Sequence, residues 1–372
     1  MVAIVECNNK KEQKNFLKFP INLYKGSKYF VPPLHIDEKK IFSPTYHYHK
    51  TSKVIFFNAY KDGKHVGRIQ GIISYPSNEK WNQKRVRFTR FDSINDKEVS
   101  NALFDALTKW AKENGMEEIN GPLGYSDLER EGLLIEGFNY DSTFEEQYNY
   151  DYYQELIESY GFKKEVDWVE RRLYPIDSIN PKIEKLVNFV LKEQNLRICR
   201  FKNINELIRK YGNELFDLID LTYNNLYQTV PLTKEQVKEL INMFKIIVTP
   251  FYCRLVVDKD DKLVAFGVCF PSIGKILRHS KGKLTPTAII RILKAIRKPK
   301  SVDLGLIGVY PKYLNNGVAW VILLELSKIM NEGNIKYCET NLTLENNLAI
   351  QNCFRKFPNI LHKRRRAYIK KI

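Results

Sequence analysis

The stretch "IGVYPKYLNNGVAW", residues 307–320, joins a strand-like apolar run to a strongly helical one. The apolar run ends at Tyr310, Pro311 interrupts it, and Gly317 precedes the helical run "VAWVILLELSKIM". A helix N-terminus has unpaired backbone N–H groups and a partial positive charge, and glycine lets the backbone approach a phosphate closely. The stretch therefore predicts a strand-to-helix turn that is either a plain loop or a phosphate cradle.

The elements around this turn repeat in the same order in both halves of the chain. Hairpins are predicted at 54–75 and 251–271, and each is followed by a strand and by a long helix that a glycine ends. A further strand, a helix and a closing strand complete each half. This repetition, with a length of 372 residues, predicts two tandem domains, 1–178 with an N-terminal arm and 179–372.

Apolar residues at helical spacing predict most of the helices. In the helix 97–114, Asn95 is expected to be the N-cap and Gly115 the terminator. A strand is expected at 336–342. The other helices are predicted at 152–160, 181–194, 204–228, 233–246, 317–331 and from about Asn346.

Val309, Pro311, Gly317 and Ala319 have the spacing of a known loop. They resemble the acyl-CoA loop of the GCN5-related N-acetyltransferase (GNAT) fold, Val-x-Pro-x-x-(Arg/Gln)-x-x-Gly-x-(Gly/Ala). Leu314 stands where that pattern has Arg or Gln. The resemblance implies a mixed α/β fold, with two tandem GNAT-like domains that are each a mostly antiparallel twisted sheet flanked by helices.

A second segment is similar to the same family. Asn346, Ala349 and Ile350 match its Asn-x-x-Ala-Ile helix start. The resemblance implies that acetyl-CoA, or another acyl-CoA, binds at the turn 309–320, with the pyrophosphate on the backbone amides of about 315–320 and the pantetheine arm on Val309. The implied binding residues are Val309, Leu314, Asn315, Asn316, Gly317, Val318, Ala319 and Asn346.

The first half resembles the same fold in a degenerate form. Its closing helix and strand, 152–173, fit the family, but "RFTRFDSIND" before the helix at 97 has no glycine. Asp92 and Asp96 would repel a pyrophosphate. A single cofactor site is therefore expected, in the second domain.

Acyl transfer to an amine needs a bound thioester, donors for the oxyanion and a route for the amine proton. Glu339 is the candidate catalytic base, because on the predicted strand it shares a face with Tyr337 and Asn341. The alternative is a glutamate that is merely polar at a strand end. Cys353 stands where relatives have a tyrosine acid, so Tyr337 or Tyr368 is expected to replace it, or no acid is used.

The acceptor is expected to be an amine of a small molecule or a peptide. The segment 140–153 mixes aromatic and acidic residues, and it either lines an amine-binding cleft between the domains or packs as a connecting loop. The composition does not name the acceptor.

The net charge of +17 and the pI near 9.4 favour anionic partners. Nucleic acid binding is predicted for the basic segments 278–300 and 354–371, against the alternative of a solvated surface. Two further functions stay open: a tRNA-dependent aminoacyl transferase of the cell-wall peptide type, and a non-catalytic RNA- or partner-binding module.

Six cysteines without a CxxC pair, and the lack of a signal-peptide pattern, predict a soluble cytoplasmic protein. The longest apolar run is too short for a transmembrane segment. No metal site is expected, because no His or Cys residues have metal-ligand spacing.

Overall fold

The two halves of the chain share one 14-stranded sheet. The computed structural model describes residues 1–176, 181–314 and 316–372. The strand order is β1-β2-β3-β4-β5-β14-β7-β12-β11-β10-β9-β8, with β13 beside β7 and β6 beside β14. The strands are β1 (Val2–Glu6), β2 (Ser52–Lys61), β3 (Lys64–Ser74), β4 (Arg85–Ser93), β5 (Glu118–Gly121), β6 (Leu133–Glu136), β7 (Lys163–Leu173), β8 (Arg197–Cys199), β9 (Cys253–Val257), β10 (Leu263–Pro271), β11 (Val302–Val309), β12 (Cys338–Thr340), β13 (Thr343–Leu344) and β14 (Asn359–Lys371).

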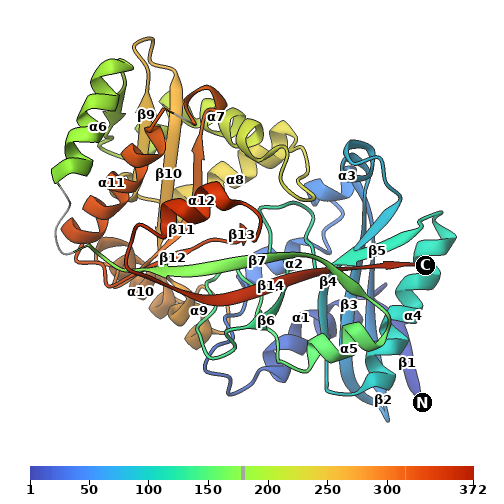
Figure 1. Ribbon diagram of the computed structural model, residues 1–372. Helices are drawn as coiled ribbons and strands as arrows, with labels where there is room; N and C mark the ends of the chain where they lie inside the picture. The colour runs from blue at the N-terminus through green and yellow to red at the C-terminus, as the bar shows by residue number, and fades with distance from the viewer. Residues whose placement is uncertain (177–180, 315) are drawn as a thin grey trace.

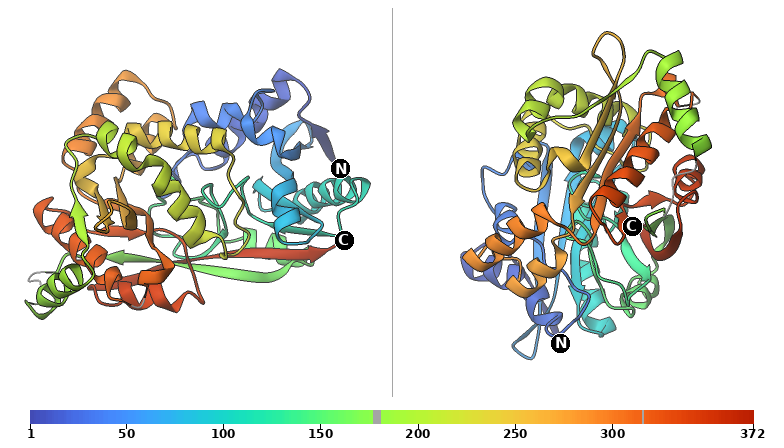
Figure 2. Two further views of the ribbon diagram at one scale, coloured as in Figure 1. Left: turned by 90° about the horizontal axis from the view of Figure 1, so that it is seen from above. Right: turned by 90° about the vertical axis from the view of Figure 1, so that its left-hand side faces the viewer.

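Helices cover both faces of this sheet (Figure 2). They are α1 (Lys10–Leu23), α2 (His35–Lys40), α3 (Tyr75–Lys80), α4 (Lys97–Glu113), α5 (Tyr153–Ser159), α6 (Pro181–Glu193), α7 (Ile204–Tyr223), α8 (Lys234–Ile247), α9 (Gly274–Ser280), α10 (Pro286–Arg297), α11 (Val318–Glu332) and α12 (Leu348–Phe354). Within the described ranges, no helix is both long enough and apolar enough to cross a bilayer.

In the first half, α1 and α4 lie on opposite faces of the sheet. A Cβ atom on Gly67 would lie 2.9 Å from Leu103 of α4, whereas the next residue, Arg68, donates a hydrogen bond to the Phe16 carbonyl of α1. Neighbouring residues of a strand point to opposite faces, so β3 contacts both helices. The predicted helix 97–114 is confirmed, but its N-cap is Asp96, whose carboxylate accepts from the Glu98 amide, and not Asn95.

The second half repeats this arrangement. Val256 packs with α6 and α11, while its neighbours Leu255 and Val257 pack with α7 and α8. The predicted helices 181–194 and 233–246 are confirmed as α6 and α8. The helix α7 ends at Tyr223, earlier than the predicted 228.

The closing strands of the two halves are exchanged. β7, from the first half, pairs with β12 of the second, and β14, from the second half, pairs with β5 of the first. β7 and β14 also pair with each other along most of their length and cross the middle of the molecule (Figure 1). The expected pair of separate sheets is therefore one continuous sheet, and the predicted boundary at 178/179 lies outside the described residues.

Three local predictions differ from the structure. The start of the chain is not only an arm, because β1 and α1 form there and Asn9 caps α1 by accepting from the Glu12 amide. The predicted strand 336–342 is shorter, since β12 ends at Thr340. The last helix starts at Leu348 and is capped by Asn347, not by Asn346.

Candidate active site

The strands β11 and β12 separate in the middle of the sheet. They pair in parallel only at 302–304 with 338–340. A bulge at Gly305 follows, because Leu304 and Leu306 oppose the adjacent residues Cys269 and Val268 of β10. The Asn341 side-chain amide donates to the Gly305 carbonyl at 2.8 Å. Beyond this point, β11 borders a gap between the strands.

The backbone of β11 faces this gap at alternate residues. Tyr310 donates from its amide to Val264 on the β10 side, so Ile307 and Val309 present their backbone groups to the gap. The hydroxyl of Tyr223, at the end of α7, donates to the Ile307 carbonyl at 3.0 Å and accepts from the Ile307 amide at 3.3 Å. A backbone-like ligand at Ile307 would therefore replace the Tyr223 hydroxyl.

The strand-to-helix turn follows β11. Gly317 has φ of 79°, in the left-handed region that glycine favours, and is the N-cap of α11. The Asn316 amide donates to the Tyr313 carbonyl at 3.1 Å, whereas the amides of Gly317 and Val318 have no acceptor among the described residues. A Cβ atom on Gly317 would lie 3.0 Å from Val190 of α6. The turn thus has two amides without a described acceptor, one on the partly exposed Gly317 and one on the buried Val318, and α6 borders it on one side.

The other residues implied at this turn are placed as follows. Leu314 is exposed, and Asn316 accepts at its carbonyl from the Gln194 side chain at 2.7 Å. Val318 is fully buried, backbone included, so its amide would have to be uncovered before it could meet a ligand. Asn315 lies outside the described residues. Ala319 is half-buried beside α6, and Asn346 is exposed before α12.

The corresponding region of the first half is filled by side chains. The Ser93 amide donates to the Tyr153 hydroxyl at 3.2 Å, and its carbonyl accepts from the Tyr152 hydroxyl at 2.8 Å. At the start of α4, the Asp96 carboxylate lies 2.6 Å from Lys61. This end of α4 already holds a negative charge, which opposes a pyrophosphate.

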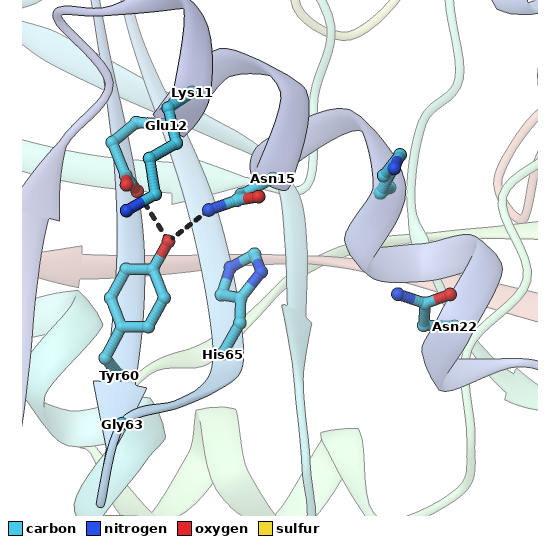
Figure 3. A pocket seen from close by; sticks show the side chains of 8 residues that line it. Lys11, Glu12, Asn15, Asn22, Tyr60, Gly63 and His65 are labelled. Carbon is cyan, nitrogen blue, oxygen red and sulfur yellow. Dashed lines mark hydrogen bonds between the residues drawn. The ribbon is translucent and has the colours of Figure 1, made fainter.

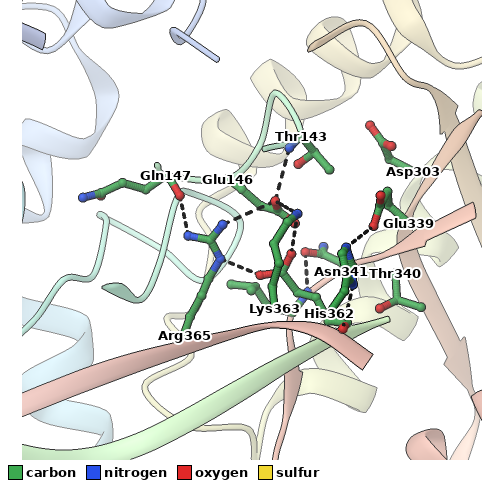
Figure 4. Close-up of polar contacts among 12 residues, drawn as sticks. Thr143, Glu146, Gln147, Asp303, Glu339, Thr340, Asn341, His362, Lys363 and Arg365 are labelled. Carbon is green, nitrogen blue, oxygen red and sulfur yellow. Dashed lines mark hydrogen bonds and ion pairs between the residues drawn. The ribbon is translucent and has the colours of Figure 1, made fainter. Parts of the chain in front are cut away.

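Next to the gap, acidic and basic side chains form a buried group that we call the central polar cluster (Figure 4). The strands β7, β11, β12 and β14 carry most of it, and a covering loop, residues 137–149, closes over it from the first half. The buried members are Asp303, Glu339, Glu170, His362, Lys363, Arg365 and Glu146, and the eighth member, Glu145, is partly exposed.

Glu339 lies against Arg172 and His362. Arg172 donates to its Oε1 atom from Nε at 2.8 Å and from Nη2 at 2.5 Å, and His362 Nε2 lies 2.7 Å from Oε2. Burial raises the pKa of the Glu339 carboxyl, but His362, Lys363 and Arg172 together hold that pKa below its usual value. Glu339 is therefore ionised at neutral pH.

A second set of pairs lies along β14. The Lys363 ammonium is 2.9 Å from Glu146 and 3.0 Å from Glu170, and Arg365 donates to Glu170 at 2.6 Å. Burial raises the pKa of Glu170, and the charges of Lys363 and Arg365 overcome this effect and lower it to about 2. The predicted basic segment 354–371 therefore has Lys363 and Arg365 engaged inside the protein.

Two further carboxyls have raised pKa values. Asp303 accepts from the Ser272 hydroxyl at 2.5 Å, while its Oδ2 atom has no partner among the described residues. Burial raises the pKa of Asp303 well above its usual value. Burial, and then the charge of Glu146, raise the pKa of Glu145 to about 7. Sequence reasoning missed both, although a lone acid within the apolar strand "SVDLGLIGV" was a signal for Asp303.

The candidate proton donors lie away from the gap. The Arg172 guanidinium stacks 4.1 Å from the Tyr337 ring. Tyr337 precedes Asn341 by four residues, which is about 13 Å along an extended chain. Tyr368 lies opposite Gly121 in the sheet of the first half, so it cannot reach the gap.

Each half of the chain also has a cavity. The larger, about 500 Å³, lies between α1 and the β2–β3 hairpin of the first half (Figure 3). Its polar groups bond to one another, since the Tyr60 hydroxyl donates to Glu12 and accepts from Asn15. Lys61, next to Tyr60, pairs with Asp96 at the start of α4, so this cavity lies near the turn of the first half, whereas the Gly317 turn belongs to the other half.

The smaller cavity, about 50 Å³, lies between α7, α8 and the sheet. Its lining is entirely apolar or glycine, and includes Leu306 of β11 and Gly212 of α7. The bulge at Gly305 turns Leu306 to the same face of the sheet as Asp303. An apolar cavity and an acidic cluster therefore lie along one strand on one face.

This architecture is the tandem GNAT fold. The chain aligns over its whole length with the solved structure of a tandem GNAT protein from the clavulanic acid biosynthesis pathway, at a TM-score of 0.58, 9% identity and 98% coverage of that chain. It also aligns over its whole length with the GCN5-related glucosamine N-acetyltransferase region of a fungal multi-domain β-N-acetylglucosaminidase, at 0.60 and 10% identity, covering 38% of that chain.

Two curated proteins are similar in sequence over nearly their whole length. Protein YghO of Escherichia coli (strain K12) is 26% identical, with 98% of this chain and 94% of that protein covered. The bacterial ceramide synthase of Caulobacter vibrioides (strain NA1000 / CB15N) is 21% identical, with 99% and 97% covered. No model of a known protein family matches the sequence.

Proposed function

We propose that this protein is an N-acyltransferase that moves an acyl group from acyl-CoA to an amine, at a single site in its second half. The observation that carries the proposal is the gap between β11 and β12, which leads to the free amides of Gly317 and Val318 and adjoins the central polar cluster. The GNAT fold supports it, because this turn stands where that fold's acyl-CoA loop is expected.

The donor would be held mainly by backbone. The amides of Gly317 and Val318 would receive the pyrophosphate, and Val309 and Ile307 the amides of the pantetheine arm. The bound donor supplies an activated thioester. Binding at Ile307 requires the Tyr223 hydroxyl to move aside, which is the local rearrangement the site needs.

The reaction forms one bond and breaks one. The amine nitrogen attacks the thioester carbonyl, the C–N bond forms, the C–S bond breaks, and the proton lost by the amine is balanced by the proton gained by the thiolate. Glu339 is ionised, but Arg172 and His362 already contact its carboxylate. Glu145 has a pKa of about 7, close to neutral pH. We propose that one of these two carboxylates accepts the proton lost by the amine. Glu145 is the better candidate, because its pKa is closer to neutral pH. Tyr337 acts by positioning Arg172.

The acceptor we propose is an amine with a long alkyl chain. An ammonium group fits beside Asp303 and Glu145, and an alkyl chain fits the apolar cavity at Leu306 on the same face. The relative named as a bacterial ceramide synthase, similar over almost the whole chain, supports a lipid amine.

The test is a calorimetric titration of the full chain with CoA. Wild type is expected to bind, and Gly317→Glu to weaken binding at least about tenfold relative to Gly317→Gln, because the two variants share size and backbone strain and differ only in the charge facing the pyrophosphate. A transfer assay then supplies acyl-CoA with long-chain amino alcohols and detects the amide by mass spectrometry. Absence of CoA binding by wild type, or equal binding by the two variants, would contradict the proposed site.

A further inference from the structure

The helix α10 has an apolar stripe on its solvent side. Ala288 and Ile292 are buried against the protein, as an amphipathic helix requires. On the outside, however, Ile289 is 44% exposed and Ile290 and Leu293 are each 54% exposed. Isolated exposed apolar residues are common on proteins, but three on neighbouring positions of one helix form a patch that needs a partner.

Basic residues flank this stripe. Between residues 281 and 300 the sequence has seven Lys or Arg and no Asp or Glu. Arg291, Lys294 and Lys298 follow at helical spacing next to the apolar stripe. In the described parts of the chain, no carboxylate lies within ion-pair distance of these three side chains.

We infer that α10 binds the surface of an anionic lipid bilayer, with its apolar stripe in the headgroup boundary and its basic residues on lipid phosphates. A helix with one apolar stripe flanked by Lys and Arg is the usual structure that lies in a membrane interface. Nucleic acid, expected earlier for segment 278–300, would be met by the basic side chains alone and would leave Ile290 and Leu293 in water. The inference is independent of the proposed chemistry.

The position of α10 connects this surface with the proposed active site. The helix α9 precedes it directly, and the two lie side by side (Figure 1). Arg278 of α9 donates to Asp141 of the covering loop at 2.7 Å. The helix packed beside α10 is thus bound to the loop that closes over the central polar cluster.

The experiment measures sedimentation of the full chain with vesicles of phosphatidylcholine, alone or mixed with phosphatidylglycerol. Wild type is expected to bind the mixed vesicles at least about tenfold more strongly, since each Lys or Arg near an anionic surface contributes about fivefold. Ile290→Glu with Leu293→Glu should lower that binding at least about tenfold. Arg291→Gln with Lys294→Gln should lower it about 25-fold at low salt and less at high salt.

The matched control places the same two charges on α6, as Leu186→Glu with Phe189→Glu, at side chains that are 44% and 60% exposed. This control should bind within about twofold of wild type, and circular dichroism should show all variants folded. Failure of wild type to sediment with the mixed vesicles overturns the inference, as does equal loss in the α6 control. Salt-dependent binding of tRNA without vesicle binding would assign the surface to nucleic acid instead.

Discussion

Two glutamates of the same site have pKa values shifted in opposite directions, and the neighbours of each explain the sign. Around Glu339, Arg172 and His362 outweigh burial and lower the pKa. Around Glu145, burial and the adjacent Glu146 raise the pKa to about 7. Such separation of two carboxyls is the usual way in which a site obtains an acid and a base at one pH.

The two shifts predict opposite pH dependences of stability. Because Glu145 has a raised pKa in the folded state, its favourable contribution is present below about pH 4.5 and is lost as the pH rises to about 7. Glu145→Gln should therefore gain up to about 3 kcal/mol of unfolding free energy over wild type between pH 4.5 and 8. Glu339→Gln should lose about 3–5 kcal/mol at pH 7, because Arg172 and His362 stay buried without their partner, and the loss should shrink as the pH falls below 4.5.

Urea unfolding at pH 4.5, 6 and 8 measures both differences. A parallel pH dependence of Glu145→Gln and wild type would show that the raised pKa of Glu145 is absent. A Glu339→Gln variant as stable as wild type at pH 7 would show that Arg172 and His362 have other partners.

The sequence correctly predicted that Glu339 lies on a strand, because strand patterns are local. It could not supply Arg172 and His362, because these come from β7 and β14, and the pairing of those strands depends on the whole fold. Asp303 and Glu145 were missed for a related reason: their raised pKa values come from burial, which the sequence does not give directly.

At the scale of elements, α7 shapes both parts of the proposed site. Its last residue, Tyr223, caps the edge of β11, and Gly212 in its middle lines the apolar cavity. Nearby atoms leave room at Gly212, where a Cβ atom would meet only Ile208, at 3.2 Å.

This geometry predicts a chain-length effect. Gly212→Leu fills the cavity and should lower kcat/KM at least about tenfold for an amine with a long alkyl chain, while an amine with a short chain should react within about twofold of wild type. Gly212→Ala, which adds one methyl group, is the matched control and should react nearly as wild type does with both. Leucine has a higher helix propensity than glycine, so the variant should remain folded.

Steady-state assays with the two amines, measured by thiol release, check this expectation. Equal losses for short and long amines would remove the cavity from the acceptor site.

The elements that sequence reasoning predicted well are those with their own local signals. The helix α4 ends at Glu113, two residues before the predicted terminator Gly115, which has φ of 71°, and α6 begins at Pro181. The short strand β1 was missed although four of its five residues are apolar, because so short a run carries little periodicity, and α1 was missed because Pro20 within it reads as a helix breaker.

For the whole molecule, the exchanged closing strands make each half depend on the other. Tyr368 of β14 is completely buried in the core of the first half, and Leu173 of β7 is completely buried in that of the second. Neither half can complete its core from its own residues.

Residues 1–176 and 181–372, produced separately, are therefore each expected to aggregate or to show no cooperative unfolding. Produced together, they should form a one-to-one complex that unfolds in a single transition, because the exchanged strands join the two cores. Size-exclusion chromatography and calorimetry distinguish these states. A separate half that unfolds cooperatively near the melting temperature of the full chain would contradict this dependence.

The repetition of elements in the two halves was visible in the sequence, and so was the number of units. The exchange of the closing strands was not visible in the sequence. Both β7 and β14 are long strands of polar and apolar residues at the end of a half, so the pattern of either strand is compatible with pairing in either half.

The strand β14 also determines the order of events during biosynthesis. The first half leaves the ribosome early, but the strand that fills its sheet next to β5 is translated only after the preceding elements of the second half. At about 5–20 residues per second, the nascent first half waits roughly 10 to 40 s for it. During this interval the exposed edge of β5 is open to other chains, so this protein depends on chaperone protection at the ribosome more than two independently folding domains would.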